Sequence, residues 1–395
     1  MFYKNARIFG SDFKFHHGAF EVTDDGRFGA VLPQNVPEDA YDLEGATVIP
    51  GLIEVHSHGN SGYDFSDGSY EGLVEMAKYF LSCGVTSFAP ASMTLPYETL
   101  EKAFATARRI VDENPAGCSK LRGIQMEGPY FCYKKRGAQN ADYLKEPDFE
   151  GFKKLFDGCG GLVKIVDVAP ELPGAAEFIQ KASKLCTVSV AHTDSDYEHA
   201  KTAFSVGATH LTHLYNAMPG INHRNPGVIP AAAECPHVRA EIICDGLHIH
   251  PAAIRLAFAM FGGERMILVS DSGRCAGQPE GYQFDLGGQM AEIRGVLRSS
   301  SAVRPSPAPP PTCGSASGTP SPSAFGKKTR FGHAPTTLPV PWALRARLAP
   351  LLPARWLTSW SAAPTMPRSG SSWPASRSKS KIQRVGTCPH PFFML

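Results

Sequence analysis

Hydrophobic positions between residues 50 and 272 form short runs that alternate with amphipathic stretches. Two of these stretches, 70–81 and 96–111, repeat apolar residues at helical spacing and predict helices. The short runs predict eight strands, at residues 52–56, 85–89, 121–127, 162–168, 187–192, 209–213, 239–245 and 266–271. Eight strands that alternate with helices predict an α/β fold, a TIM-type (β/α)8 barrel whose functional site lies at the carboxyl ends of the strands.

The segments on either side of this region have a different pattern of hydrophobic and polar residues. Residues 1–49 read as short strands separated by turns and predict a small β domain. Residues 280–297 return to a β pattern, and we expect them to rejoin that domain as part of a β-sandwich. The predicted domains are therefore 1–49, the barrel at 50–279, the β segment at 280–297 and a tail at 298–395.

The tail differs from the rest of the chain in composition and charge. The whole chain holds 39 Lys and Arg against 37 Asp and Glu, yet every acidic residue lies at or before Glu292. The tail is rich in Pro and Ser and holds all four tryptophans, so we expect it to be disordered. Two interpretations remain open: a basic arm that binds a polyanion, or an out-of-frame translation of GC-rich coding sequence.

Cysteine usage and the N-terminus suggest a cytoplasmic protein. The ten cysteines are scattered without a Cys-x-x-Cys pair, which is typical of reduced thiols. The first residues lack a basic segment followed by an apolar stretch, so no secretory signal is expected. No apolar run is long enough to span a membrane, so no membrane partner is expected.

Residues able to bind a metal or move a proton gather at the predicted strand ends. His56 and His58 are two residues apart, and alternate residues of a strand face the same side, so both imidazoles can point at one ion. Each of the others could be a structural hydrogen-bonding or capping residue, but a closed barrel brings all these strand ends to one mouth. The further candidates are Glu127, His192, His213, His248 and Asp271.

Several longer motifs surround these candidate residues. They are Pro50-Gly-Leu-Ile-Glu-Val-His-Ser-His-Gly59, Glu127-Gly-Pro129, Lys135-Arg-Gly-Ala138, Ala191-His192, Thr212-His-Leu-Tyr-Asn-Ala-Met218, His223-Arg-Asn-Pro-Gly227, Asp245-Gly-Leu-His248 and Val269-Ser-Asp271, followed by Ala276-Gly277. Together these motifs resemble the N-acetylglucosamine-6-phosphate deacetylases of the amidohydrolase superfamily. The resemblance covers residues 1 to about 297.

The resemblance implies a metal-dependent hydrolysis with these roles for individual residues. Glu127, His192 and His213 would hold a first divalent ion, zinc or iron, and His56 and His58 would hold a second if one is present. Asp271 would take a proton from water and later deliver it to the leaving amine, and His248 would hold the acetamide carbonyl. The residues implied to contact the sugar are Ala138, Asn216 and Ala217, and those implied to contact the phosphate are Arg224 and His223.

The chemistry needs these residue types independently of the resemblance. A bound divalent ion lowers the pKa of its water towards ~7 and polarises a carbonyl, and neutral histidines and a carboxylate are suitable ligands.

Two residues depart from the family pattern. Glu54 stands where relatives commonly have Asp. Gln139 stands where some have His, and we expect it to bond a sugar hydroxyl.

The expected substrate is a small amino-sugar phosphate, and the expected products are D-glucosamine 6-phosphate and acetate. Two other interpretations remain: another amidohydrolase, such as a cyclic amidase or a deaminase, or a non-catalytic remnant whose tail binds a polyanion. The main interpretation includes no nucleic-acid partner and, for a chain with the family's C-terminal region, implies a homodimer.

The family resemblance stops where the tail begins. Nothing after Arg298 resembles the Asp-Gly-Thr-Leu-Ala-Gly-Ser segment and last helices with which the family continues. We therefore expect apolar surface on the first and eighth strands to be left uncovered. Losing such burial, at ~25 cal/mol per Å², predicts a poorly soluble or inactive chain.

Overall fold

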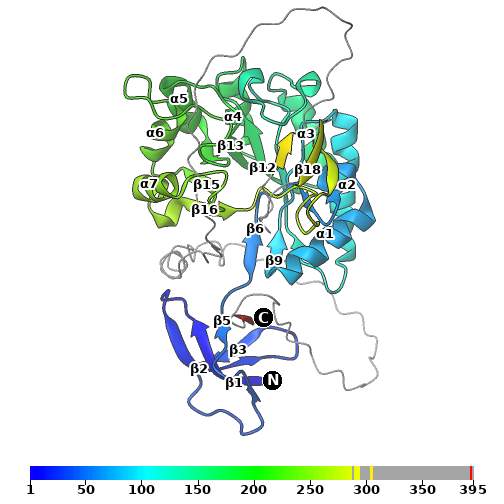
Figure 1. Ribbon diagram of the computed structural model, residues 1–395, viewed down its shortest axis with the longest axis vertical. Coiled ribbons are helices and arrows are strands. Elements are labelled where there is room, and N and C mark those ends of the chain that lie inside the picture. The colour runs from blue at the N-terminus through cyan, green and yellow to red at the C-terminus, as the bar shows by residue number, and fades with distance from the viewer. Residues whose placement is uncertain (287–288, 294–302, 306–391, 394–395) are drawn as a thin grey trace, which may run out of the picture.

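The computed structural model describes residues 1–286, 289–293, 303–305 and 392–393 and contains the predicted barrel (Figure 1). Its strands follow one another in chain order. One parallel sheet has the order β10-β9-β6, another has the order β11-β12-β13-β14-β15-β16, and the bridge between Ala91 and Gln125 joins them. The strands are β6 (Leu52–Glu54), β9 (Val85–Phe88), β10 (Lys120–Leu121), β11 (Ile124–Met126), β12 (Val163–Val168), β13 (Thr187–Val190), β14 (Ala208–Leu211), β15 (Arg239–Ile243) and β16 (Met266–Val269).

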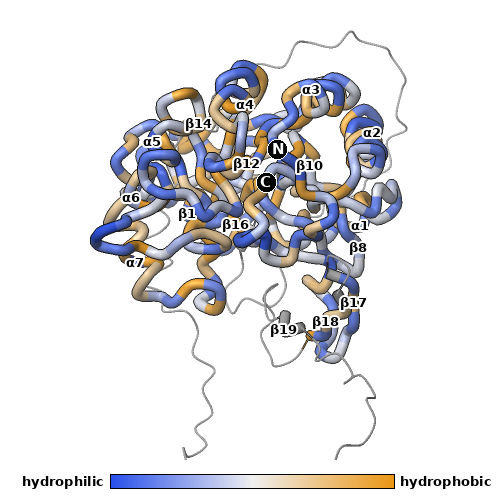
Figure 2. Tube along the Cα trace, turned by 90° about the horizontal axis from the view of Figure 1, so that it is seen from above, coloured by the Kyte–Doolittle hydropathy of each residue, from blue (hydrophilic) through white to orange (hydrophobic). Residues whose placement is uncertain are grey.

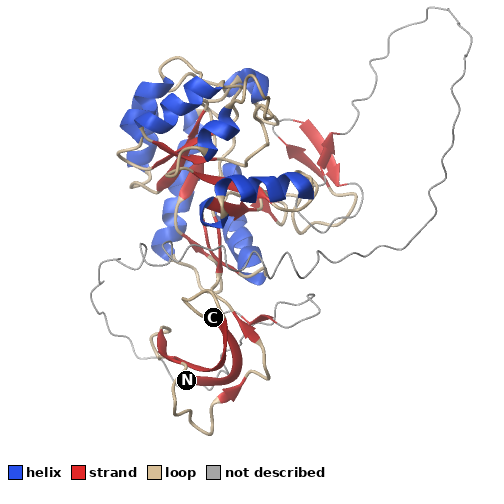
Figure 3. Cartoon of the chain, turned by 90° about the vertical axis from the view of Figure 1, so that its left-hand side faces the viewer, coloured by secondary structure: helices blue, strands red, loops and turns tan. Residues whose placement is uncertain are grey.

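Helices cover much of the outside of the barrel (Figure 3). The helices predicted at 70–81 and 96–111 are confirmed as α1 (Tyr70–Ser82) and α2 (Tyr97–Glu113). Ser69 starts α1, since its hydroxyl accepts a hydrogen bond from the Gly72 N–H at 3.0 Å. The other helices are α3 (Phe149–Gly158), α4 (Ala175–Ala182), α5 (Tyr197–Val206), α6 (Val228–Ala233) and α7 (Pro251–Phe261), with short 3-10 turns η1 (Phe65–Asp67), η2 (Tyr133–Lys135), η3 (Ala141–Tyr143) and η4 (Gly263–Arg265).

The main core lies between the strands and the inner faces of the helices. Figure 2 shows hydrophobic stretches along the strands, whereas outer loops are largely hydrophilic. An aromatic group of Tyr130, Phe149, Phe152 and Phe178 packs in this core, with the rings of Tyr130 and Phe178 4.8 Å apart. None of the helices that the structure describes combines the length and the apolar character needed to cross a bilayer.

The N-terminal segment forms the predicted small β domain, which lies at one end of the barrel (Figure 1). Its sheet has the order β20-β5-β1-β2-β3, with β4 paired to β1. Tyr3, Ile8, Phe20 and Val48 are among the buried residues of its core. The strands are β1 (Phe2–Phe9), β2 (Phe15–Val22), β3 (Phe28–Val31), β4 (Tyr41–Asp42), β5 (Thr47–Val48) and β20 (Phe392–Phe393).

The prediction that residues 280–297 rejoin this domain requires correction. β17 (Gln283–Leu286) and β18 (Gln289–Ile293) pair with β19 (Val303–Pro305) in a sheet of their own. This sheet lies beside the barrel, away from the N-terminal strands (Figures 1 and 3). In the N-terminal sheet the edge of β5 pairs with β20 instead.

The chain before β17 explains this placement. Ser61 N–H donates to the Ala276 carbonyl at 2.7 Å, and Gly62 N–H donates to the Arg274 carbonyl at 2.8 Å. The Arg274 guanidinium also pairs with Asp67 at 2.9 Å. These contacts hold the chain leaving β16 against the loop that follows β6, and β7 (Gly59–Asn60) and β8 (Tyr63–Asp64) form a small hairpin in that loop. The expected disorder of the tail falls mostly outside the described residues.

Candidate metal centre and active site

Most of the predicted ligands lie just beyond the strands rather than within them. β6 ends at Glu54, so His56 and His58 belong to the following loop, which corrects the prediction that strand alternation aligns them. His192, His213 and Asp271 each lie two residues past a strand and have positive φ angles of 44°, 31° and 47°. Such left-handed backbone is costly for residues other than glycine and is commonly found at functional sites.

Glu127, His192 and His213 form the first group able to hold a metal ion. Glu127 Oε1 lies 3.1 Å from His192 Nε2 and 3.2 Å from His213 Nε2. The two imidazole Nε2 atoms are 3.2 Å apart. All three residues are buried, so the group is shielded from bulk water.

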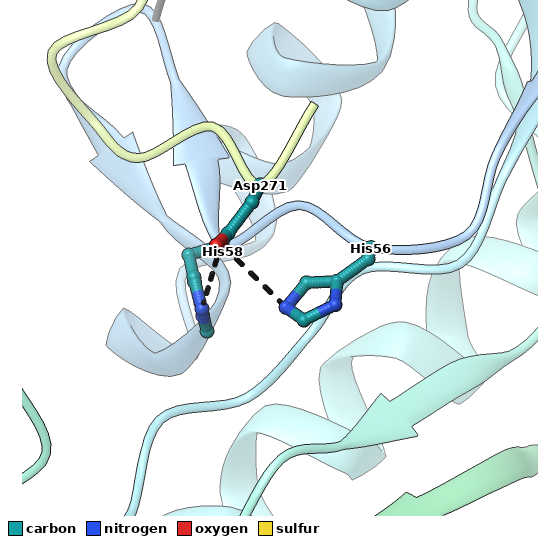
Figure 4. A group of neighbouring side chains, drawn as sticks. All are labelled: His56, His58 and Asp271. Atoms are coloured by element: carbon teal, nitrogen blue, oxygen red, sulfur yellow. Dashed lines mark ion pairs between the residues drawn. The ribbon is translucent and has the colours of Figure 1, made fainter. Parts of the chain in front are cut away.

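His56, His58 and Asp271 form the second group (Figure 4). Asp271 Oδ1 lies 3.5 Å from His56 Nε2 and 3.5 Å from His58 Nε2. The loop positions of these residues are fixed by the backbone, since Asp271 N–H donates to the His56 carbonyl at 3.0 Å and His58 N–H donates to the Ser272 carbonyl at 2.8 Å. The barrel is joined here at the mouth, where the chain after β16 meets the chain after β6.

The Glu127 carboxylate faces both groups. Its Oε1 contacts the first group, while its Oε2 lies 3.0 Å from His58 Nε2 in the second. Gln139 donates to Oε2 at 2.8 Å and accepts from the Thr94 N–H at 2.7 Å. Both ends of this amide are therefore engaged, and in this structure Gln139 orients Glu127 rather than presenting itself to a sugar hydroxyl.

The second nitrogen of three histidines is fixed by an acceptor. His192 Nδ1 donates to the Lys135 carbonyl at 2.9 Å, and His58 Nδ1 donates to the Ala91 carbonyl at 3.2 Å. His56 Nδ1 lies 2.7 Å from Glu241 Oε2. Because a carbonyl oxygen only accepts, the proton of a neutral ring is on Nδ1, and the lone pair of Nε2 points towards the centre.

Electrostatics at the centre couple the carboxylates to the imidazoles. Burial alone lowers the pKa of His56, but the charges of Glu241 and Asp271 outweigh it and hold this pKa well above its usual value. Burial also works to raise the pKa of Glu127, but the charge of His58 and hydrogen bonds from the neighbouring imidazoles hold it well below its usual value. The imidazoles and carboxylates of the centre therefore hold protons in the absence of a metal ion, and a divalent cation displaces these protons when it binds.

These distances fit a metal ion. Ligands about 2.0–2.1 Å from a tetrahedral zinc lie about 3.3 Å from one another. The three atoms of the Glu127 group are 3.1, 3.2 and 3.2 Å apart. In the second group His56 Nε2 is buried and has no hydrogen-bond partner among the described residues. Imidazole nitrogens and carboxylate oxygens suit zinc and iron alike.

The residues expected to contact substrate lie on loops after the strands. Asn216 and Ala217 follow β14, and the Asn216 side-chain nitrogen is buried without a hydrogen-bond partner among the described residues. Ala138, His223 and Arg224 are exposed. His248 is also exposed, and its Nδ1 pairs with Asp245 at 2.7 Å rather than with either metal-binding group. Their roles in substrate binding remain predictions.

Sequence reasoning missed two buried carboxyl groups inside the barrel, Glu241 and Asp167, and named Glu54 only as a departure from the relatives. Glu241 and Asp167 are 0% exposed, and burial raises the pKa of Asp167 well above its usual value. Glu54 accepts from the N–H groups of His56 and Ser270, and burial raises its pKa to about 7. Acidic residues within otherwise apolar strand segments were the available signal, because a buried carboxyl group needs specific partners.

Comparison with known proteins agrees with this geometry. The amidohydrolase family matches residues 47–276. An N-acetylglucosamine-6-phosphate deacetylase of Bacillus subtilis is 36% identical over 279 residues, which cover 69% of this chain and 70% of the relative. The deacetylase of the same name from Vibrio furnissii is 36% identical over 265 residues, which cover 67% of this chain and 66% of that protein.

A solved structure shares the fold. An N-acetyl-D-glucosamine-6-phosphate deacetylase variant from Mycobacterium smegmatis, in complex with N-acetyl-D-glucosamine 6-phosphate, superposes with a TM-score of 0.69 at 27% identity, covering 76% of this chain and 80% of that one. The chain belongs to the amidohydrolase family, among the N-acetylglucosamine-6-phosphate deacetylases.

Proposed function

We propose that this protein hydrolyses the acetamide of N-acetyl-D-glucosamine 6-phosphate to D-glucosamine 6-phosphate and acetate. The main support is the Glu127 carboxylate, which has imidazoles of two metal-binding groups around its two oxygens. One or two divalent ions, zinc or iron, would be held by Glu127, His192 and His213 and by His56 and His58. A bound ion would supply an activated water and a polarised carbonyl.

Asp271 is the proposed proton carrier. Its side chain is 22% exposed, whereas the Glu127 side chain is 2% exposed, so Asp271 is the carboxylate of the centre that faces solvent. A carboxylate there can take a proton from the attacking water and return it to the departing amine. His248, held through Nδ1 by Asp245, keeps Nε2 for the acetamide oxygen.

The polar groups around the mouth suit a sugar phosphate. The Asn216 side-chain nitrogen, which has no hydrogen-bond partner among the described residues, is a donor for a sugar oxygen. Ala217 and Ala138 are proposed as further sugar contacts. The exposed Arg224 guanidinium and the His223 imidazole suit a phosphate dianion, for which a guanidinium fork is well matched. A cyclic amidase or a deaminase gives no reason for a guanidinium and an imidazole at these two positions.

The setting of the enzyme is also a proposal. The eight cysteines of the described region are free thiols, which supports a cytoplasmic location. The homodimer implied by the family is proposed for a chain that carries the family's C-terminal region.

The test is acetate release by the purified full chain. In the soluble, folded fraction of this chain we expect turnover of N-acetylglucosamine 6-phosphate, much weaker turnover of N-acetylglucosamine without phosphate, loss of turnover after chelation, and recovery with Zn²⁺ or Fe²⁺. The uncovered flank is expected to reduce the yield of that fraction. Elemental analysis should find one or two ions per chain. A metal-free protein, or one that hydrolyses a cyclic imide and not the amino-sugar phosphate, would contradict the proposal.

A further inference from the structure

Glu241 lies inside the barrel, behind the metal-binding groups. It belongs to β15 and its side chain is 0% exposed. Its Oε2 lies 2.7 Å from His56 Nδ1 and accepts from the His213 N–H at 3.2 Å. One carboxylate oxygen therefore contacts one member of each metal-binding group.

The two contacts of Glu241 determine how the imidazoles of His56 and His213 are oriented towards the metal-binding groups. A carboxylate that accepts from Nδ1–H fixes the ring tautomer and makes Nε2 a stronger ligand. The second contact holds the backbone of His213 where φ is 31°, a conformation that needs support from its surroundings. The Glu241 carbonyl accepts from the Leu214 N–H at 2.8 Å, which adds a further anchor to the same turn.

The other carboxylate oxygen of Glu241 lies at one end of a buried series of polar side chains that contact one another. Its Oε1 lies 3.7 Å from His210 Nε2, and His210 Nδ1 is 3.0 Å from the Ser189 hydroxyl. That hydroxyl is 2.6 Å from Thr212 Oγ1, which donates to Asp167 at 3.2 Å. A buried carboxylate without ideal partners is costly, and stability alone gives a weak reason for its presence.

We infer that Glu241 is a positioning residue of the metal centre, which orients His56 through Nδ1 and His213 through its backbone N–H. The inference rests on the metal-dependent function proposed above. It requires the carboxylate charge as well as the hydrogen bond, since the charge strengthens Nε2 of His56 as a ligand.

Asp167 offers a matched control. It is also a 0% exposed carboxyl in the barrel interior, and its partners are Gln125 and Thr212 rather than an imidazole of either group. Asp167→Asn therefore removes a buried carboxyl whose hydrogen bonds go to Gln125 and Thr212 and not to a metal ligand. Glu241→Gln keeps the size of the side chain and removes its charge, whereas Glu241→Ala removes both.

The experiment measures metal affinity by competition with a chromogenic chelator, together with the visible spectrum of the Co²⁺-substituted full chain. We expect affinity to fall ~10–100-fold in Glu241→Gln and further in Glu241→Ala, with a changed cobalt spectrum. Asp167→Asn should keep the wild-type affinity and spectrum. Circular dichroism checks folding, and the glutamine variant decides the question if the alanine variant does not fold.

The outcomes separate the two proposals. Unchanged affinity and spectrum in Glu241→Gln overturn the role of Glu241 and leave the proposed function intact. An equal loss in Asp167→Asn also overturns it, because any buried carboxyl would then have the same effect. A wild-type protein that binds no ion rejects the metal-dependent function and this inference together.

Discussion

Two walls of the barrel differ in how they are covered. On β12, β13 and β14, Val166, Val188 and Leu211 are 0% exposed beneath the outer helices. On β6 and β16, Leu52, Ile53 and Leu268 are 42%, 46% and 41% exposed. Among the described residues, the expectation that apolar surface on the first and eighth strands stays uncovered is thereby confirmed, while its consequence for solubility and activity stays a prediction.

The same open flank nevertheless carries intact site residues. His56, which follows β6, is 0% exposed, and Glu54 accepts hydrogen bonds from the backbone of both His56 and Ser270. The mouth of the barrel is thus joined by polar contacts that do not depend on the outer cover. In this fold the metal-binding residues are positioned independently of the helices that cover the outside of the barrel.

Replacing Glu127 should have the largest effect. In the wild-type protein, imidazole nitrogens lie near both carboxylate oxygens of Glu127. In Glu127→Gln one of these oxygens becomes an N–H₂ group, which cannot bind a metal ion, so we expect turnover below detection. Metal affinity should fall by more than the ~10–100-fold that loss of an outer-shell partner costs. Elemental analysis and acetate release measure this. Full metal content with normal turnover would show that this end of the barrel is not the site.

Asp271→Asn should leave the ions of the Glu127 group in place and slow the chemistry. We expect kcat to fall ~10²–10⁴-fold, because an amide cannot take the proton. Steady-state kinetics on protein of verified metal content provide the test. Unchanged turnover would remove Asp271 from the mechanism.

Phe152→Ala tests the covered wall. Phe152 is 0% exposed within the aromatic group, and its loss should reduce the free energy of unfolding by ~3–5 kcal/mol. Leu256 on α7 is 50% exposed, so Leu256→Ala should change stability by no more than about 0.5 kcal/mol. Denaturant titrations compare the two. Equal effects would mean that the walls are not covered as the structure describes.

Threonine at Leu52, Ile53 and Leu268 tests the open flank and should have the smallest effect on stability. Each change should alter the free energy of unfolding by about 0.5 kcal/mol or less. Binding of a hydrophobic dye and aggregation should both decrease, because the apolar patch shrinks. A loss of several kcal/mol for the triple variant would show that something covers this flank in solution.

The sequence alone determined the order and type of the elements. Periodic apolar residues predicted the eight strands and both assigned helices, with α1 and α2 ending within two residues of the expected positions. It also placed Glu127, His192, His213 and Asp271 at strand ends, because the change from an apolar run to a polar residue is local. Closure of a barrel then brings such ends together.

Only the tertiary structure decided which side chains from different strands and loops contact one another. His56 and His58 converge through a loop, Glu127 faces both groups, and Gln139 turns to Glu127. Glu241 meets His56 from 185 positions away along the chain, and the chain after β16 is held at the mouth instead of returning to the N-terminal sheet. Local periodicity reports which face of an element is buried, whereas these contacts depend on where distant side chains meet inside the barrel.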